Sequence, residues 1–452
     1  MVRILGYGVL LTASLLGGSR SASAQGTFPG AVAMGEALAV ASVRRWEGTR
    51  APRREAHERP PTAQRTCAGD VCIHGPAALR DQTRPLAEAG AAFIRFLDRA
   101  AFRSAPADGG RGGDDRLDIY LSPATNGVAA FMDAENAVRY HDSALTFGVA
   151  DPRTCGAGLE RCVLQAVAQA RLLAMLPDEG DGWHEALSAW LLWRYTGRFG
   201  AHDEDMQAQF APRFAPVERA RSHSGSLLLA YVDARMGGDG RFIREVCELA
   251  RQRTWDDADY RGSPDLWQAL AVALDRGGER LHSILEDAAA DRARMMLGSP
   301  SAVLPGVAPG AGPLAIVDGA ELPAHTPPGP ELGPFASSFA LVDLGESARE
   351  GRRLRVWLRG EYGVEWSLTA IRLGADGEDL GRLSAPPRRG DGRSYLPVEI
   401  GPETARVLVA VTNLSHRLPD ADEPFDPNGR AFRMISDFAD DLADDDGDEG
   451  RP

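Results

Sequence analysis

The sequence contains no lysine, so all 50 of its basic residues are arginines. Aspartate and glutamate together number 64, which leaves a formal net charge of -14 over 452 residues. An acidic chain without a concentrated basic face is a poor binder of nucleic acid. We therefore expect its partner to be something other than nucleic acid.

Histidine is also scarce, with nine residues and no two closer than 17 positions. The chain consequently has no H-x-H, H-x-x-H or H-x-x-x-H pair, on which zinc sites recognisable from sequence depend. The G-x-S-x-G and G-x-x-x-x-G-K-[ST] patterns are absent as well. These absences argue against the common hydrolase and nucleotide-binding motifs. They predict no metal and no cofactor, although histidines distant in sequence could still assemble a metal site.

Long apolar runs are missing everywhere except near the N-terminus. Arg3 precedes an apolar stretch at Ile4–Leu16, and Ala22-Ser23-Ala24 follows in the small-x-small pattern that signal peptidase recognises. The stretch is too short to cross a bilayer. We therefore predict a signal peptide cleaved after Ala24, and a mature chain without a membrane span that acts in the periplasm or outside the cell.

Only five cysteines are present, and four of them form two close pairs. Cys67 lies near Cys72, Cys155 lies near Cys162, and Cys247 stands alone in a helical pattern. In an oxidising compartment these spacings predict two short-loop disulfides. Cys247 is predicted to be a buried free thiol.

Two kinds of periodicity divide the chain. Apolar residues recur at helical spacing through most of residues 77–297, interrupted by one strand pattern at 116–121. Short alternating runs then occupy residues 338–436, at the spacing of an antiparallel sandwich. The predicted fold class is α+β: a mostly helical zincin-like domain with a small N-terminal sheet, then a C-terminal antiparallel β-sandwich.

Composition sets the domain boundaries. Eight prolines between Ser301 and Phe335 indicate a linker, and eight acidic residues among the last sixteen indicate a solvated tail. The predicted segments are the signal peptide (1–24), a leader or linker (25–65), the helical domain (66–300), the Pro/Gly-rich linker (301–335), the β-sandwich (336–436) and the acidic tail (437–452).

One helical pair carries the residues with most bearing on chemistry. In the apolar stretch Cys162–Leu176, Gln165 and Gln169 lie four residues apart and so share one helix face. Glu185 follows on the next predicted helix. Two ligands at i and i+4 with a glutamate from the following helix is the arrangement of H-E-x-x-H zinc peptidases. Here the pentapeptide reads QAVAQ.

The surrounding sequence resembles the secreted gluzincin-like metallopeptidases of bacteria over most of residues 66–300. Gly112–Tyr120 is similar to the strand before their active-site helix, and Trp183–Trp190 is similar to the helix with their third zinc ligand. The order and spacing of these segments carry the resemblance, since no single one is highly specific.

The resemblance implies a degenerate site. Gln165 and Gln169 stand where the family has its zinc-binding histidines, Ala166 replaces the glutamate that acts as general base, and Glu185 retains the third ligand. Carboxamides bind zinc weakly compared with imidazole, and alanine cannot accept a proton from a bound water. The resemblance therefore implies a pseudopeptidase with no catalytic residue.

Three further features have a structural and a functional interpretation. Trp357 and Trp366 alternate with polar residues on predicted strands, so we expect them in the core, with a glycan-binding platform as the alternative. The segment Asp420–Asn428 is expected to be an acidic turn, with a calcium loop as the alternative. His184 is expected at the surface or at an interface.

Three functions follow from these features. The first is an exported, non-catalytic peptidase homologue that binds a peptide, a protein or an envelope glycan. The second is an active secreted hydrolase with a non-standard site that includes Glu185. The third is an adhesion or interaction protein that acts through its C-terminal β-sandwich.

Overall fold

The computed structural model describes residues 56–124, 127–135, 143–177, 179–197, 224–252, 266–301, 303–304, 314–325, 332, 335–345, 351–385, 392–414 and 430–439. The predicted signal peptide, most of the leader and most of the acidic tail lie outside these residues. The chain is a mixed α+β protein with several largely antiparallel sheets, as the sequence predicts. None of the described helices is both long and apolar enough to span a membrane.

A first sheet has the strand order β1-β2-β3-β5-β4. Its strands are β1 (Gln64–Ala68), β2 (Val71–Gly75), β3 (Leu117–Leu121), β4 (Val128–Glu135) and β5 (Ala144–Ala150). The three central strands are parallel, and the two edge strands are antiparallel to their neighbours. Parallel neighbours need a long crossover connection, which helix α2 (Arg80–Arg99) provides between β2 and β3.

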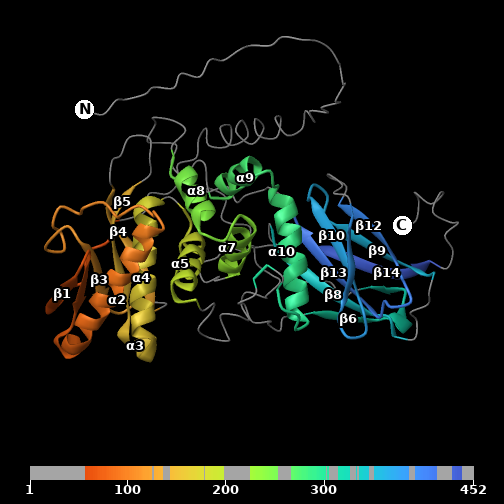
Figure 1. Cartoon of the computed structure of the whole chain (residues 1–452), viewed down its shortest axis with the longest axis horizontal. Coiled ribbons are helices and arrows are strands. Elements are labelled where there is room, and N and C mark those ends of the chain that lie inside the picture. The colour runs from red at the N-terminus through yellow and green to blue at the C-terminus, as the bar shows by residue number, and fades with distance from the viewer. Residues whose placement is uncertain are drawn as a thin grey trace, which may run out of the picture. The chain divides into compact units, whose positions relative to one another are not determined.

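The helices form the middle of the chain (Figure 1). Besides α2 they are α3 (Pro152–Cys155), α4 (Leu159–Met175), α5 (Asp181–Thr196), α7 (Ser224–Arg235), α8 (Arg241–Ala250), α9 (Leu266–Arg276) and α10 (Leu281–Met296). Helices α2 and α4 pack against the first sheet and against each other, and α5 packs between α4 and α7. Helix α5 ends where Gly197 adopts φ 69° and its N–H reaches the Trp193 carbonyl, a glycine-dependent cap.

Two C-terminal sheets complete the structure. Sheet C has the order β11-β10-β13-β8-β6, and sheet D has the order β12-β9-β14-β7. The strands are β6 (Ala315–Asp318), β7 (Ala324–His325), β8 (Ser337–Asp343), β9 (Arg353–Gly360), β10 (Trp366–Leu373), β11 (Asp379–Ser384), β12 (Arg393–Glu399), β13 (Arg406–Asn413) and β14 (Phe432–Ala439). Buried residues of both sheets, including Val356, Leu368 and Met434, share one core.

The two sheets differ in how many faces are covered. Helix α10 packs on β10 and β13 of sheet C, so both faces of these strands are buried. Strand β13 is accordingly apolar without interruption from Val407 to Val411, as expected for a strand covered on two sides, whereas β10 also buries Ser367 and Thr369. Strands β9, β12 and β14 of sheet D instead alternate buried and exposed positions, so sheet D has one uncovered face.

Several differences from the predicted elements concern short or edge strands. The predicted linker at 301–335 contains β6 and β7, which pair at the edges of sheets C and D. The prolines around them interrupt helix without preventing edge strands, which can leave N–H groups unpaired. Strand β14 continues to Ala439, into the predicted acidic tail.

Both predicted disulfides are present. Cys67 and Cys72 are directly opposed on β1 and β2, and Cys155 of α3 is bonded to Cys162 of α4. Cys247 is a buried free thiol, as expected.

Candidate binding face on the C-terminal sheets

The uncovered face of sheet D carries a row of large side chains, which we call the tryptophan row. Its members are directly opposed across the four strands: Tyr395, Trp357, Ile435 and His325. The Trp357 and Tyr395 rings lie 4.2 Å apart between centroids, at an interplanar angle of 35°. Trp357 remains 40% exposed in spite of this contact. A large, partly stacked aromatic surface is therefore open to solvent.

A second row, the arginine row, lies two residues along the strands. Arg393, Arg359 and Arg433 are directly opposed on β12, β9 and β14, and all three are exposed. Among the described residues, neither Arg359 nor Arg433 has an acidic partner. Directly opposed like charges destabilise a sheet. The arginine row is thus expected to lower the stability of sheet D, and packing among the described residues does not account for its presence.

The arginines at the other end of β9 are arranged differently. Arg355 lies opposite Asp437 and forms a two-point ion pair with it, at 2.9 Å (Nε to Oδ1) and 2.8 Å (Nη2 to Oδ2). Arg353 lies 3.8 Å from Glu399 of β12. Cross-strand charge pairing is therefore found at this end of β9, whereas Arg359 and Arg433 lack an acidic partner among the described residues.

The sequence of β9 explains why these side chains share a face. In the segment RLRVWLRG, successive side chains point to opposite faces, so Leu354, Val356 and Leu358 enter the core with 0–2% exposure. Trp357 and Arg359 are thereby directed outward.

Trp366, unlike Trp357, is buried in the core between the two sheets. It is 2% exposed and packs near Phe432, with 5.6 Å between ring centroids. Gly360 leaves room for it, because a Cβ at this glycine would lie 2.1 Å from the indole Nε1. The expected core position is confirmed for Trp366 and wrong for Trp357, whose strand presents it on the outer face.

The positions of the degenerate peptidase motif lie on α4 and α5, which pack against each other. Gln165 is half-buried, Gln169 is 6% exposed, and Glu185 is half-buried on α5. Ala166 is fully buried against β5, where a Cβ added to Gly148 would lie 3.1 Å from the Ala166 Cβ. This close packing leaves little room for a side chain longer than alanine at position 166.

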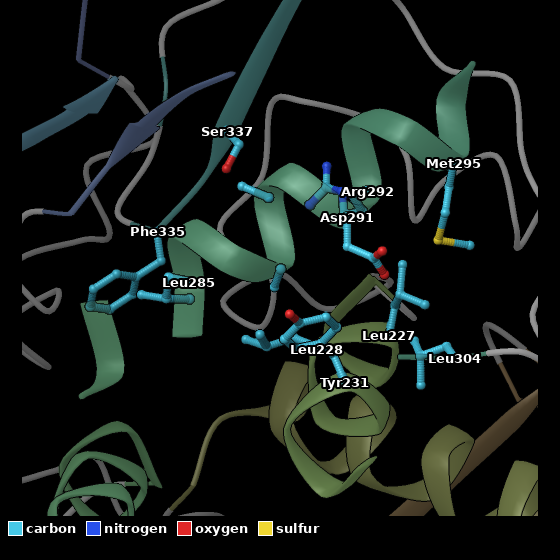
Figure 2. A pocket seen from close by; sticks show the side chains of 12 residues that line it. Leu227, Leu228, Tyr231, Leu285, Asp291, Arg292, Met295, Leu304, Phe335 and Ser337 are labelled. Carbon is cyan, nitrogen blue, oxygen red and sulfur yellow. The ribbon is translucent and has the colours of Figure 1, made fainter. Parts of the chain in front are cut away.

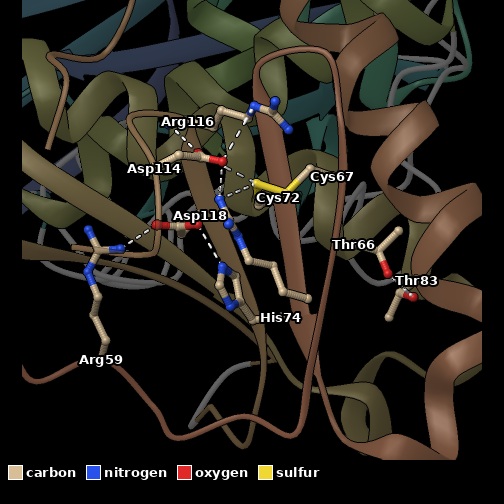
Figure 3. Close-up of a disulfide and its surroundings, with 10 residues drawn as sticks. Arg59, Thr66, Cys67, Cys72, His74, Thr83, Asp114, Arg116 and Asp118 are labelled. Carbon is tan, nitrogen blue, oxygen red and sulfur yellow. Dashed lines mark hydrogen bonds and ion pairs between the residues drawn. A yellow bond between two sulfur atoms is a disulfide. The ribbon is translucent and has the colours of Figure 1, made fainter. Parts of the chain in front are cut away.

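Metal ligands are similarly restricted in the described part of the chain. One group of three candidate ligands lies close together there, formed by Cys67, Cys72 and Asp114. Both sulfurs belong to the disulfide, so neither is a thiolate that could bind a metal. Figure 3 shows this disulfide beside Asp114 and Arg116.

A buried ionic network lies next to this disulfide (Figure 3). The Arg59 guanidinium contacts Asp118, Asp108 (2.5 Å) and Asp133 (3.0 Å). His74 Nε2 lies 2.6 Å from the other oxygen of Asp118. Burial opposes the charged form of Arg59, but a Tyr120 hydrogen bond and the surrounding carboxylates raise its pKa.

The charged groups of this network are paired with one another, so its role is structural. It fastens the segment around residue 59 to the first sheet, where the His57 N–H also donates to Met132 O at 2.9 Å. In the sequence, this ionic network is indicated by Asp118, an acidic residue within the fully buried strand β3. Such a residue requires partners from elsewhere in the chain.

One pocket lies among α7, α10 and β8 (Figure 2). Its volume is about 30 Å³ and its lining is mostly apolar. Arg292 borders it, with Nε and Nη2 buried and without hydrogen-bond partners among the described residues, and its guanidinium lies 5.4 Å from the Phe339 ring centre. Burial lowers the pKa of Arg292 to about 10. A space of this size suits roughly two water molecules, too little for a sugar or a peptide.

The histidine expected at the surface or at an interface is buried. His184 is 5% exposed, and its Nε2 lies 2.9 Å from the Leu176 carbonyl. Helix α5 is covered on both sides by α4 and α7, which leaves little of it at the surface. The alternative calcium loop, Asp420–Asn428, lies outside the described residues.

No known protein family matches the sequence. No curated protein matches it either. Among solved structures, the chain is similar to the enzymatically active domain of tailspike protein 4 from bacteriophage CBA120, at 11% identity over 23% of this chain and 14% of that chain, with a TM-score of 0.17. It is also similar to TmCBM61 in complex with β-1,4-galactotriose, at 19% identity over 23% of this chain and 59% of that chain, with a TM-score of 0.15.

A xylan-binding domain from Paenibacillus barcinonensis gives a comparable match, at 10% identity over 22% of this chain and 60% of that domain, with a TM-score of 0.14. This chain thus spans less than two thirds of each of the three structures. Similarity this low carries no argument about fold or function, so the assignment below rests on the chain's own geometry.

Proposed function

We propose that this protein is an exported, non-catalytic carbohydrate-binding protein that acts through the uncovered face of sheet D. The observation that carries the proposal is the partly exposed, tilted aromatic pair of Trp357 and Tyr395 on that face. Export, which the N-terminal sequence predicts, would place the face in contact with envelope or extracellular polysaccharide.

An exposed tryptophan on a flat strand suits a sugar ring. One face of a pyranose presents C–H groups, which pack on the electron-rich face of an aromatic side chain, while its hydroxyls remain hydrated or bind polar neighbours. The alternating strand places polar and charged side chains on both sides of Trp357, where such hydroxyls would lie. The internal pocket at Arg292 is too small to be the sugar site.

The helical part of the chain supports the same proposal as a scaffold. Helix α10 covers the outer face of sheet C, and Ser367 of β10 donates a 2.6 Å hydrogen bond to Glu286 of α10. We propose that this part descends from a zincin-like peptidase and has lost its chemistry, since glutamines and an alanine occupy the catalytic positions. Sheet D would then be the working surface.

The test is polysaccharide binding by the full-length mature protein. Affinity electrophoresis against a panel of neutral and acidic polysaccharides should find at least one ligand. The substitution Trp357→Ala should weaken that binding more than about tenfold, as expected for loss of a central aromatic contact. Ile316→Ala is a matched control, because Ile316 is 72% exposed but lies on sheet C.

Two outcomes would overturn the proposal. One is the absence of binding to every polysaccharide in the panel. The other is equal binding by the Trp357→Ala and Ile316→Ala variants, which would place any sugar site elsewhere.

A further inference from the structure

We infer that the arginine row makes this face selective for an acidic polysaccharide, one that carries carboxylate groups on its sugar rings. The inference rests on the proposed function, since it names the substrate class of the same face. It is carried by a separate observation, the direct cross-strand opposition of Arg393, Arg359 and Arg433.

The position of Arg359 is the central point. It has an arginine opposite it on each neighbouring strand, and no acidic partner among the described residues. Opposed like charges cost stability in the free protein. Acidic residues outnumber basic ones in this chain, 64 to 50, so the absence of an acid here is not a matter of composition.

Other arginines of β9 can be compared with Arg359. Arg355 and Arg353 lie further along β9, and each has a carboxylate on a neighbouring strand, Asp437 and Glu399 respectively. The tryptophan row separates these paired arginines from the unpaired Arg359. Among the described residues, Arg359 therefore lacks the carboxylate that Arg355 and Arg353 have, and a ligand could supply one.

The spacing of the two rows fits a sugar ring and its substituent. Positions two apart on a strand are separated by about 7 Å, and neighbouring strands by about 4.8 Å. A pyranose stacked on Trp357 would direct a ring substituent toward Arg359. The planar guanidinium binds a carboxylate through two parallel N–H···O bonds, which a neutral hydroxymethyl group cannot reproduce.

Other polyanions would meet the same charges. A single-stranded nucleic acid could also stack on Trp357 and contact the arginine row, and the chain's net charge of -14 opposes every long polyanion alike. An anionic lipid surface would need apolar groups that reach into the membrane. On this face the partly exposed Trp357 is instead flanked by arginines along its own strand, so the apolar surface available for insertion is small. Both polyanions are included in the experiment as competing outcomes.

The experiment compares polygalacturonate with its fully methyl-esterified form, using the full-length mature protein and isothermal titration calorimetry. The acidic form should bind at least about tenfold more tightly, as expected for charge-assisted hydrogen bonds. Its affinity should fall with added NaCl, because exposed charges are screened. Single-stranded oligo-dT and vesicles of phosphatidylglycerol serve as the competing polyanions.

Arg359→Gln is the decisive variant and Arg355→Gln its matched control on the same strand. Arg359→Gln should remove the preference for the acidic form, keep binding to the esterified form, and leave the melting temperature unchanged or higher. Arg355→Gln should keep the preference. A lower melting temperature for Arg359→Gln, or equal loss in both variants, would show a structural role and overturn the inference.

Failure of this inference can be separated from failure of the proposed function. Equal binding of both polymer forms, abolished by Trp357→Ala, would retain a carbohydrate-binding face and refute its acid selectivity. Tighter binding of oligo-dT or vesicles than of polygalacturonate would refute the substrate class. Absence of binding to any polysaccharide would refute both.

Discussion

Ser367 of β10 donates a 2.6 Å hydrogen bond to the Glu286 carboxylate of α10, so a polar contact joins the helices to sheet C. Burial raises the pKa of Glu286 above its ordinary value of 4.5, while the Ser367 hydrogen bond acts in the opposite direction. The contact therefore tolerates the protonated acid better than the carboxylate. The contact between α10 and sheet C thus includes an acid whose charged form is disfavoured by burial.

A pH-dependent stability difference follows for Glu286→Gln. A raised pKa means that the folded state retains the proton longer than the unfolded state, so stability is lost as pH rises from about 4.5 through the folded-state pKa. Glutamine mimics the protonated acid and keeps an acceptor for Ser367. The variant should melt higher than wild type at pH 8 and equally at pH 4, as measured by calorimetry.

The matched control for this prediction is Glu88→Gln, which removes an exposed carboxylate paired with Arg84 on α2. Exposed i,i+4 pairs contribute little to stability. A pH-independent difference for Glu286→Gln would contradict the assignment.

The tight contact between β5 and α4 predicts a second effect. A Cβ at Gly148 would lie 2.7 Å from Ile119 Cδ1 and 2.9 Å from the Ala166 carbonyl oxygen. Gly148→Ala should therefore destabilise the protein by about 1–3 kcal/mol, the usual cost of overpacking. Urea unfolding measures the change. Gly401→Ala, whose added Cβ meets nothing nearer than 3.8 Å, should have a much smaller effect.

The elements of this fold could be predicted from sequence to the extent that periodicity determines them. Apolar spacing predicted helix through most of residues 77–297, and α4, α5 and α10 lie within that region. Of the first sheet, only β3 carried a predicted strand pattern, so β1, β2, β4 and β5 were missed together with β6, β7 and β11. Several of these strands are short or lie at sheet edges, and β2 and β5 are buried along nearly their whole length and so do not alternate. Pattern alone cannot identify strands that do not alternate.

The candidate site was harder to predict than the fold. Trp357 and Trp366 were both expected in the core, although Trp357 is in phase with the arginines of β9, and this alternation already indicates an outward position. The arginine row depends on the spatial order β12-β9-β14, which brings together segments far apart in the chain. No local sequence pattern indicates the spatial order of these strands, so the cross-strand opposition of the arginines could not be predicted.

The single free cysteine provides a chemical test of the core. Cys247 is fully buried, and burial raises the pKa of its thiol. Reaction with a disulfide reagent requires both access and the thiolate. Native protein should therefore show no titratable thiol with Ellman's reagent, and urea-unfolded protein should show one per chain. A rapid native reaction would contradict the burial, and more than one thiol after unfolding would contradict the disulfides.

The degenerate peptidase positions lead to a prediction about zinc. Two carboxamides and an alanine at Gln165, Ala166 and Gln169 are poor zinc ligands, so the purified protein should retain less than one zinc per chain after dialysis against a zinc-containing buffer, by elemental analysis. The double variant Gln165→His/Gln169→His restores the spacing of the family motif and is the positive control. Stoichiometric zinc in wild-type protein, with chelator-sensitive proteolysis, would contradict the pseudopeptidase proposal.

The last prediction concerns Arg292, whose buried Nε and Nη2 atoms have no partner among the described residues. Burial lowers the pKa of this group to about 10, below its ordinary value of 12.5, so the folded state releases the proton more readily than the unfolded state. Both states are charged at pH 7, where the full cost of burying the cation is present, and this cost would be relieved only as pH rises above 10. Replacing a buried charge with an apolar side chain of similar volume is often stabilising.

Arg292→Met should therefore equal or exceed wild type in thermal stability at pH 7. Arg294→Met, two residues further along α10, removes a 3.0 Å ion pair with Asp379 of β11 and should cost up to about 1 kcal/mol, as expected for a partly exposed pair. The expected stability changes of the two variants have opposite signs. Arg294 is paired with an acid across the contact between helix and sheet, whereas Arg292 borders an apolar pocket. Strong destabilisation by Arg292→Met would show that the guanidinium has a partner in solution, and the pocket would then have to be reconsidered as a site that holds an anion.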